Sequence, residues 1–196
     1  MKNSGVIVGL VLAVVGLMYW GRNQVKSMII NTDTALQDSN VIALLAVLRE
    51  IEGMNSYWTL YHCPHDDPLY DPSLPLTFTD PSTHPNIRIP FTNPATGRGD
   101  YSTAAGGYQI THPTWLGLSV LPGAPIDFGP NAQDWYAVQL LKMNGALAPL
   151  MAGNFQQAMQ LASGTWASLP YTNSQQHHLT LASVQGLYQQ NGGSIA

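Results

Sequence analysis

Glu52 is placed to act as an acid in this chain of 196 residues. It ends an apolar segment over residues 41–53, and four aliphatic residues precede it at spacings of eleven, eight, seven and four positions, which puts all five on one helix face. Those four are Val41, Leu44, Leu45 and Leu48. A carboxylate on an apolar face is poorly solvated, so we expect its pKa to rise and the group to hold a proton near neutral pH, as a general acid must.

Two considerations qualify this prediction. Glu50, the other glutamate of the chain, points about 200° away from Glu52 at the usual ~100° per helical residue, so it does not share the apolar face. The alternative interpretation of Glu52 is a structural glutamate that is hydrogen-bonded at the end of a helix.

A second group of chemically active residues lies between His62 and Asp67, where two histidines, one cysteine and two aspartates occur together. Their spacing matches no zinc pattern, and Pro64 and Pro68 predict a loop. We therefore predict no metal and no cofactor. Cys63 is the single cysteine of the chain, so no internal disulfide can form.

The charge composition excludes a nucleic-acid partner. Charged residues make up 9% of the chain, with 7 basic against 11 acidic side chains and a net charge of −4. Three of the basic residues flank the N-terminal segment, so the globular part keeps only Arg49, Arg88, Arg98 and Lys142. Because no basic patch can neutralise phosphates, a ligand held by hydrogen bonds and stacking is favoured.

The N-terminal segment over residues 4–20 is uncharged and close to the minimum length of a bilayer-spanning helix. Tyr19 and Trp20 fit an interfacial aromatic belt, and residues 18–22 lack the small residues of a signal-peptide cleavage site. We therefore predict an uncleaved transmembrane helix that contacts the lipid bilayer through residues 4–20. The predicted organisation is an anchor over residues 1–27, a connector over 28–38 and a globular domain over 39–196.

The order of predicted elements indicates an α+β fold. A helix capped by Asp38 or Ser39 ends at Gly53, and the next 47 residues, 54–100, contain eight prolines that forbid a long helix. Short strands or extended loops are expected at 76–79 and 87–91. Four helices are expected near residues 111–121, 130–144, 154–162 and 174–191. This order predicts a mostly helical lobe and a lobe of loops and short strands that flank a cleft.

Short motifs follow Glu52 in a fixed order. They are Glu52-Gly53, Tyr70-Asp71, Phe78-Thr79-Asp80, His84-Pro85, Ser102-Thr103-Ala104-Ala105-Gly106-Gly107-Tyr108-Gln109, Asp127-Phe128, Gln133-Asp134 and Trp166-Ala167-Ser168-Leu169-Pro170. Over about residues 40–190 this series resembles the phage lambda lysozyme family, which are lytic transglycosylases of peptidoglycan. The resemblance implies a lysozyme-like fold and Glu52 as the catalytic residue.

The sequence departs from the family pattern at three places. Gly107 stands where the family has the arginine of Gly-Arg-Tyr-Gln, so one charge at the cleft is lost. After residues 166–170 the family has a small-residue turn and Tyr-Gly-Gln, so the cleft tyrosine is either absent or displaced to Tyr171. The segment over residues 93–100 is longer than usual, and the predicted anchor is not part of the family domain.

The resemblance implies cleavage of the β-1,4 bond from MurNAc to GlcNAc with formation of 1,6-anhydro-MurNAc. One carboxyl group can perform this reaction, because Glu52 can first protonate the leaving oxygen and then take the proton of the muramic C6 hydroxyl, which closes the ring. Asp71 or Asp80 could instead act as a second carboxylate and allow true hydrolysis. The sequence leaves this alternative open.

Five residues are predicted to bind the glycan strand of peptidoglycan: Asp71, Ser102, Thr103, Tyr108 and Gln109. Each also has a structural interpretation. The carboxylate and the two hydroxyl groups could cap turns, and Tyr108 could belong to the core. The tryptophans on helical patterns, Trp115, Trp135 and Trp166, are predicted to be core residues, and Asp134 and Lys142 to be solvated or structural.

The resemblance and the predicted anchor together place the protein in the host inner membrane as a single-pass protein. Its catalytic domain is expected on the periplasmic side, with later release from the membrane as a hypothesis. The alternatives are a virion-associated murein hydrolase that opens the wall during infection, and a non-catalytic glycan-binding protein on the same fold. The oligomeric state is left open.

Overall fold

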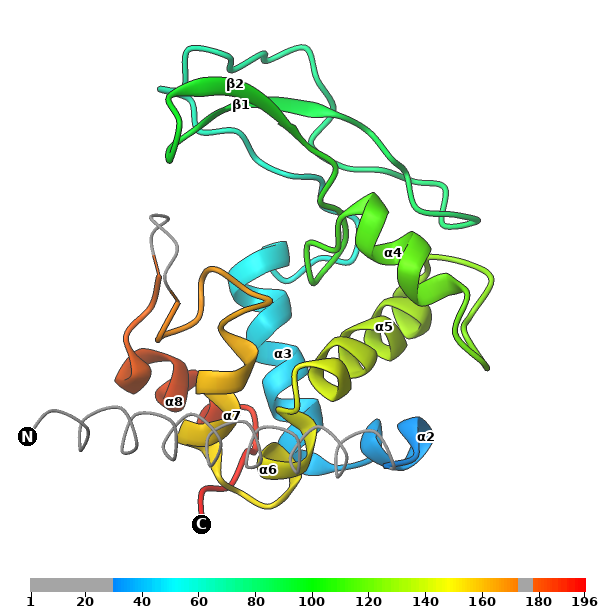
Figure 1. Ribbon diagram of the computed structural model, residues 1–196, viewed down its shortest axis with the longest axis vertical. Coiled ribbons are helices and arrows are strands. Elements are labelled where there is room, and N and C mark those ends of the chain that lie inside the picture. The colour runs from blue at the N-terminus through cyan, green and yellow to red at the C-terminus, as the bar shows by residue number, and fades with distance from the viewer. Residues whose placement is uncertain (1–29, 173–177) are drawn as a thin grey trace, which may run out of the picture.

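The computed structural model describes residues 30–172 and 178–196, which form two lobes (Figure 1). The helical lobe is built around α3 (Ser39–Gly53). Its other helices are α2 (Thr32–Ala35), α4 (His112–Ser119), α5 (Pro130–Met143), α6 (Leu147–Met151), α7 (Phe155–Ala162) and α8 (Leu181–Gln190). The smaller lobe holds the hairpin of β1 (Ile89–Asn93) and β2 (Arg98–Ser102). The predicted α+β architecture of two lobes is confirmed.

Helix α3 is the central element of the core and has the predicted bounds. The Asp38 side chain caps its start by accepting hydrogen bonds from the backbone N–H groups of Asn40 and Val41, at 3.0 and 3.2 Å. The helix ends where Met54 adopts a left-handed backbone with φ 51°. Its aliphatic face is fully buried against the surrounding helices, with 0% exposure at Val41, Leu44 and Leu48. Burial of this face removes apolar surface from water and so stabilises the helical lobe.

The remaining helices agree with those expected from the sequence, with two exceptions. The last helix begins later than expected, and two short helices were not expected. Thr111 caps α4 and Pro130 begins α5, both as expected. The last helix begins at Leu181, not near residue 174, because Thr180 accepts a hydrogen bond from the Ser183 backbone N–H at 3.1 Å and so supplies the cap. Helices α2 and α6 were not predicted, because four or five residues are too few to show a periodic pattern.

The smaller lobe depends on one antiparallel hairpin. Its register runs from Ile89 opposite Ser102 to Asn93 opposite Arg98. Asp67 fastens the preceding loop to β1, since its carboxylate accepts hydrogen bonds from the Thr92 backbone N–H and hydroxyl, both at 2.8 Å. The segment over residues 93–100 that looked like a long loop therefore contains the hairpin turn and most of β2. The other expected strand, 76–79, forms only an isolated bridge from Thr77 to Thr59.

The predicted membrane placement requires a correction. The segment 4–20, on which that prediction was based, lies outside the described residues. In the described part of the chain, no helix is both long and apolar enough to cross a bilayer. The longest of these helices, α3, has 15 residues and spans about 22 Å, short of the ~30 Å hydrocarbon core. The prediction of a single-pass protein in the host inner membrane is therefore wrong, and bilayer contact through residues 4–20 is not supported.

Candidate active site

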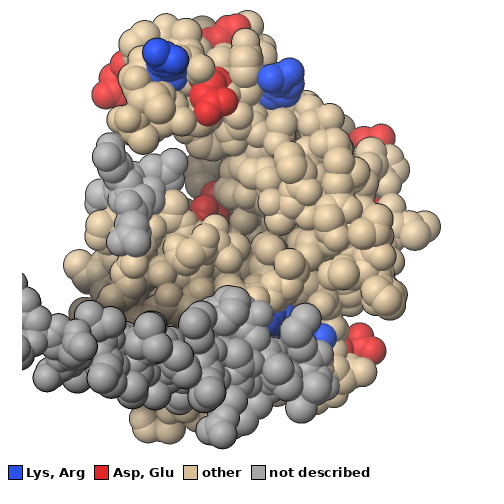
Figure 2. All heavy atoms as spheres, in the orientation of Figure 1, with Lys and Arg blue, Asp and Glu red and all other residues tan. Residues whose placement is uncertain are grey.

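A hollow lies between the two lobes, and an acidic side chain is visible inside it (Figure 2). Glu52 lies in the last turn of α3, at the end of this helix that faces the smaller lobe in Figure 1. Its side chain is half-buried, and the Ser168 hydroxyl, in the segment after α7, donates a hydrogen bond to Glu52 Oε1. Glu50 is exposed. The two glutamates therefore occupy different environments, as their spacing predicts.

Burial raises the pKa of Glu52 above its ordinary value of 4.5. Hydrogen bonds from the Ser168 side chain and backbone act in the opposite direction, because they stabilise the ionised form, but burial is the larger effect. The expected direction of the pKa is thus confirmed. The group holds its proton to a higher pH than an exposed glutamate, and Ser168 still supports the carboxylate once the proton has left.

The two candidate second carboxylates lie in exposed turns of the smaller lobe. Asp71 Oδ1 accepts hydrogen bonds from the Ser73 hydroxyl at 2.6 Å and from its backbone N–H at 2.9 Å. Asp80 Oδ1 accepts one from the Ser82 backbone N–H at 2.8 Å. These hydrogen bonds lower the pKa of both aspartates, so both are ionised at neutral pH and both cap local turns.

Three further predicted sugar-binding residues lie at the end of β2 and in the segment after it, and all are half-buried. Ser102 Oγ accepts a hydrogen bond from the Ala104 backbone N–H at 3.2 Å, and Thr103 Oγ1 accepts one from the His112 backbone N–H at 3.1 Å. Gln109 Nε2 donates to the Gly106 carbonyl at 3.0 Å. All three side chains therefore stabilise the connection between the lobes, and their contact with a sugar stays a prediction.

Tyr108 belongs to the core, with 1% exposure. Its hydroxyl donates to Asp134 Oδ1 at 2.5 Å, and the Tyr57 hydroxyl donates to the same oxygen at 2.8 Å. Arg49 Nη1 in turn donates to the Tyr57 hydroxyl at 2.7 Å. Burial, with Asp134 as the next cause, raises the pKa of Tyr108 far above its ordinary value, so the phenol stays protonated. Sequence reasoning did not identify Arg49 or Tyr57, although Arg49 precedes Glu52 by one helical turn.

The end of α3 touches the turn before Tyr108 through two glycines. A Cβ atom on Gly53 would lie 2.5 Å from the Cα atom of Gly107, so a side chain cannot be accommodated at position 53 without displacement of the backbone. The buried Gln133 of α5 fixes the same turn, because its Oε1 accepts the Gly107 N–H at 2.8 Å. Its Nε2 donates to the carbonyl groups of Tyr57 at 3.0 Å and Phe128 at 2.8 Å. The backbone that carries Glu52 is thus closely constrained.

The loop considered as a metal site has a structural role. Asp67 is hydrogen-bonded to Thr92, and the ring centroids of His65 and Tyr70 lie 4.4 Å apart. Cys63 is a half-buried free thiol. Among residues 30–172 and 178–196, no three or more His, Cys, Asp or Glu side chains are grouped to hold a metal ion. The absence of a metal stays a prediction.

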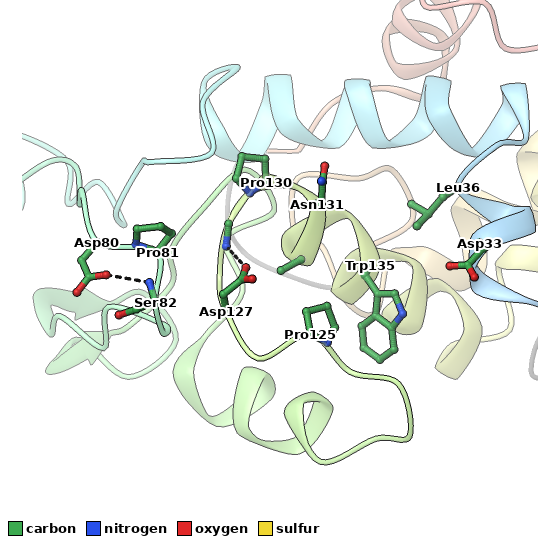
Figure 3. Close-up of a pocket in the computed structure, with 12 residues that line it drawn as sticks. Asp33, Leu36, Asp80, Pro81, Ser82, Pro125, Asp127, Pro130, Asn131 and Trp135 are labelled. Atoms are coloured by element: carbon green, nitrogen blue, oxygen red, sulfur yellow. Dashed lines mark hydrogen bonds between the residues drawn. The ribbon is translucent and has the colours of Figure 1, made fainter.

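A separate cavity of about 760 Å³ lies at the start of α5 (Figure 3). Asp33 and Leu36 lie at one end of it, beside Trp135, and the turn of Asp80 and Ser82 lies at the other, beyond Asp127. Glu52 and the five predicted sugar-binding residues do not line this cavity, although Asp80, one of the two candidate second carboxylates, does. The chemistry therefore concentrates on the junction of α3 with the smaller lobe.

Comparisons with known proteins identify the family. The family described as Endolysin matches residues 42–195. The endolysin of Escherichia phage P2 is 34% identical over 119 residues, which cover 61% of this chain and 72% of that protein. The endolysin of Escherichia phage lambda is 34% identical over 94 residues, which cover 48% of this chain and 59% of that protein.

Solved structures show the same fold. Bacteriophage lambda lysozyme complexed with a chitohexasaccharide superposes with a TM-score of 0.64 and 29% identity, covering 85% of this chain and 98% of that one. A second structure of lysozyme from bacteriophage lambda gives a TM-score of 0.58 and 26% identity over the same shares. The chain therefore belongs to the endolysin family and has the fold of lambda lysozyme.

Proposed function

We propose that this endolysin-family protein degrades the bacterial cell wall as a lytic transglycosylase. It would cleave the β-1,4 bond between MurNAc and GlcNAc in peptidoglycan and leave a 1,6-anhydro-MurNAc end. The observation that carries the proposal is the half-buried Glu52, whose pKa is raised by burial while Ser168 supports its ionised form. A single group with both properties can serve as acid and then as base.

The proposed reaction uses Glu52 twice. The protonated carboxyl group first donates its proton to the glycosidic oxygen, and the bond from that oxygen to C1 of MurNAc breaks through an oxocarbenium-like transition state. The resulting carboxylate then removes the proton of the C6 hydroxyl of the same sugar, and O6 bonds to C1. No water is consumed, and Glu52 ends the cycle protonated. The attack within one sugar gains from proximity, which can replace a second enzymatic carboxylate.

The environments of the two candidate second carboxylates support this scheme over hydrolysis. Asp71 and Asp80 are exposed and are hydrogen-bonded within their own turns. A carboxylate that activates water or attacks the sugar must face the acid across the scissile bond. The oxygens of both aspartates are instead oriented toward groups of their own turns.

The substrate class follows from the fold and from the relative with a bound glycan. Lambda lysozyme has been solved with a chitohexasaccharide, and we propose that this chain likewise holds a glycan strand in its cleft. Asp71, Ser102, Thr103 and Gln109 are exposed or half-buried and remain proposed sugar contacts. The buried Tyr108 would contribute indirectly, through its hydrogen bond to Asp134.

Mass spectrometry of digested murein tests the proposal. Digestion in water labelled with heavy oxygen should release muropeptides with anhydro ends and without label. Labelled reducing ends would refute the transglycosylase and show a hydrolase. If the folded protein binds murein and releases no muropeptides, the non-catalytic glycan-binding alternative would replace it.

A further inference from the structure

The space beside Gly107 is filled by a side chain from α3. A Cβ atom on Gly107 would lie 3.0 Å from Cγ and 3.3 Å from Cδ of Arg49, and 3.3 Å from Cδ1 of Tyr57. Positions 49 and 107 therefore compete for one volume. A long side chain can enter that volume from the helix or from the turn, and two long side chains would overpack it.

Arg49 uses this position to join four segments. Its guanidinium carbon lies 4.8 Å from the ring centroid of Tyr57, and its Nη1 lies 2.7 Å from the Tyr57 hydroxyl and 3.5 Å from the Tyr108 hydroxyl. Both phenols donate to Asp134 of α5. One cation and one anion are thus linked through two tyrosines, which ties α3, the segment after it, the 106–109 turn and α5 together.

The same residue closes the helical turn that carries the acid. The carbonyl of Arg49 accepts hydrogen bonds from the backbone N–H groups of Met54 and of Asn55, the latter at 2.9 Å. Glu52 lies between these partners in sequence. The backbone of Arg49 therefore holds the end of α3, while its side chain holds that end against the smaller lobe.

We infer that Arg49 is a positioning residue for Glu52 and that it supplies from α3 the cation that the family's Gly-Arg-Tyr-Gln motif supplies from the position of Gly107. The charge that the sequence seemed to have lost at position 107 returns from a different element. The glycine at 107 is then a consequence of the arginine at 49, because the volume beside the turn admits one long side chain.

A swap of the two residues tests the inference. Arg49→Ala should lower kcat for murein cleavage about ten- to a hundredfold, the usual effect of breaking a charged hydrogen-bond network, with a much smaller change in KM. Gly107→Arg alone should also lower kcat, since it overpacks the junction. Gly107 does not adopt a left-handed backbone, so an arginine fits there once position 49 is small and the Tyr57 ring, 3.3 Å from the new Cβ atom, shifts slightly. The double variant should therefore recover most of the lost kcat.

The decisive outcome is the sign of the effect of Gly107→Arg. It should be harmful in the wild-type background and beneficial in the Arg49→Ala background. Gly107→Met in the Arg49→Ala background fills the same volume without a charge and should not restore kcat, whereas a merely structural role of Arg49 predicts that it does. A double variant that is folded by circular dichroism and no more active than Arg49→Ala would overturn the inference. If Arg49→Ala does not fold, the same comparison in an Arg49→Ser background, where position 49 is again small, decides in the same way.

Two controls separate this inference from its premises. Lys142→Ala removes a positive charge from the other end of α5, where the Lys142 Nζ atom donates to Thr32 Oγ1, and it should leave kcat unchanged. The inference rests on the proposed function only through Glu52 as the acid. An inactive Glu52→Gln variant together with a failed swap refutes the inference alone, whereas an active Glu52→Gln variant refutes the acid itself.

Discussion

Replacement of Glu52 by glutamine should lower the activity of the protein and raise its stability at neutral pH. The substitution keeps the shape of the side chain and an oxygen that can accept the Ser168 hydrogen bond, but it removes the proton that is transferred. Glu50→Gln is the matched control, because the same chemical change occurs two residues away on the exposed side of the same helix.

The magnitude of the activity loss follows from the role of the acid. General acid–base catalysis contributes about 10²- to 10⁴-fold, so kcat of Glu52→Gln should fall by that factor, which equals about 3–5 kcal/mol of transition-state stabilisation. Glu50→Gln should retain the wild-type kcat. Turbidity loss of purified murein gives the rates, and separation of the released muropeptides confirms that the same bond is cut.

The stability change follows from the raised pKa of Glu52. Between pH 4.5 and the higher folded-state pKa, the folded state keeps a proton that the unfolded state releases, so the free energy of unfolding falls as the pH rises through this window. Glutamine has no carboxyl proton to lose, so the variant does not lose stability over this pH range. Each pH unit by which the folded-state pKa exceeds the ordinary value is worth about 1.4 kcal/mol, so Glu52→Gln should be more stable than the wild type at pH 7. The difference should disappear below pH 4.5.

Thermal denaturation at several pH values, run beside the activity assay, completes the test. Loss of the general acid should leave no more than about a hundredth of the wild-type kcat. A Glu52→Gln protein that keeps more than about a tenth of it would therefore refute the catalytic assignment. A variant that is less stable than the wild type at pH 7 would refute the buried, protonated state on which that assignment depends.

Four further predictions concern other residues of the chain. Ser168→Ala removes a hydrogen bond that favours the ionised form, so the pKa of Glu52 should rise further and the alkaline limb of the pH–kcat/KM profile should move to higher pH. Gly53→Ala forces a Cβ atom into the Gly107 backbone and should cost about 3 kcal/mol of unfolding free energy in denaturant titrations. Gly117→Ala, whose Cβ atom meets nothing within 4 Å, should instead stabilise α4 by about 0.5–1 kcal/mol. Burial lowers the pKa of His84 from 6.5 to about 4, so stability should fall by at most about 1.4 kcal/mol per pH unit as the pH drops through that range, and His84→Gln should remove this slope in calorimetry at several pH values.

The elements that the sequence predicted well are those with long local patterns. Helix α3 shows an unbroken apolar face, a capping aspartate and a terminal glycine, and all three signals depend on neighbouring residues alone. Strand β2 was missed because its side chains are mostly exposed and show no alternation of apolar and polar residues. The predicted membrane anchor shows that composition alone is a weak guide to location. An apolar run of marginal length was interpreted as a membrane-spanning helix, and no described helix supports that interpretation.

The candidate site was only partly predictable for a different reason. The position of Glu52 follows from its own helix, but its partner Ser168 is 116 residues further along the chain. Tyr108 was equally compatible with a sugar platform and with the core. The choice depends on Asp134, which reaches it from α5 across 26 residues. Arg49 was counted among the basic residues of the globular part, and only its packing against Gly107 and its hydrogen bonds to the two tyrosines give it a place in the site.

The three hydrogen bonds of Gln133 have a consequence for how a polymer enters the cleft. One side chain satisfies backbone groups of residues 57, 107 and 128, which belong to segments on both sides of the lobe junction. Any hinge motion there would break these hydrogen bonds, and each backbone group that stayed buried without a partner would cost about 1–3 kcal/mol. The width of the groove is therefore set before murein binds. The conformational entropy lost on binding is then that of the flexible glycan chain rather than that of the enzyme.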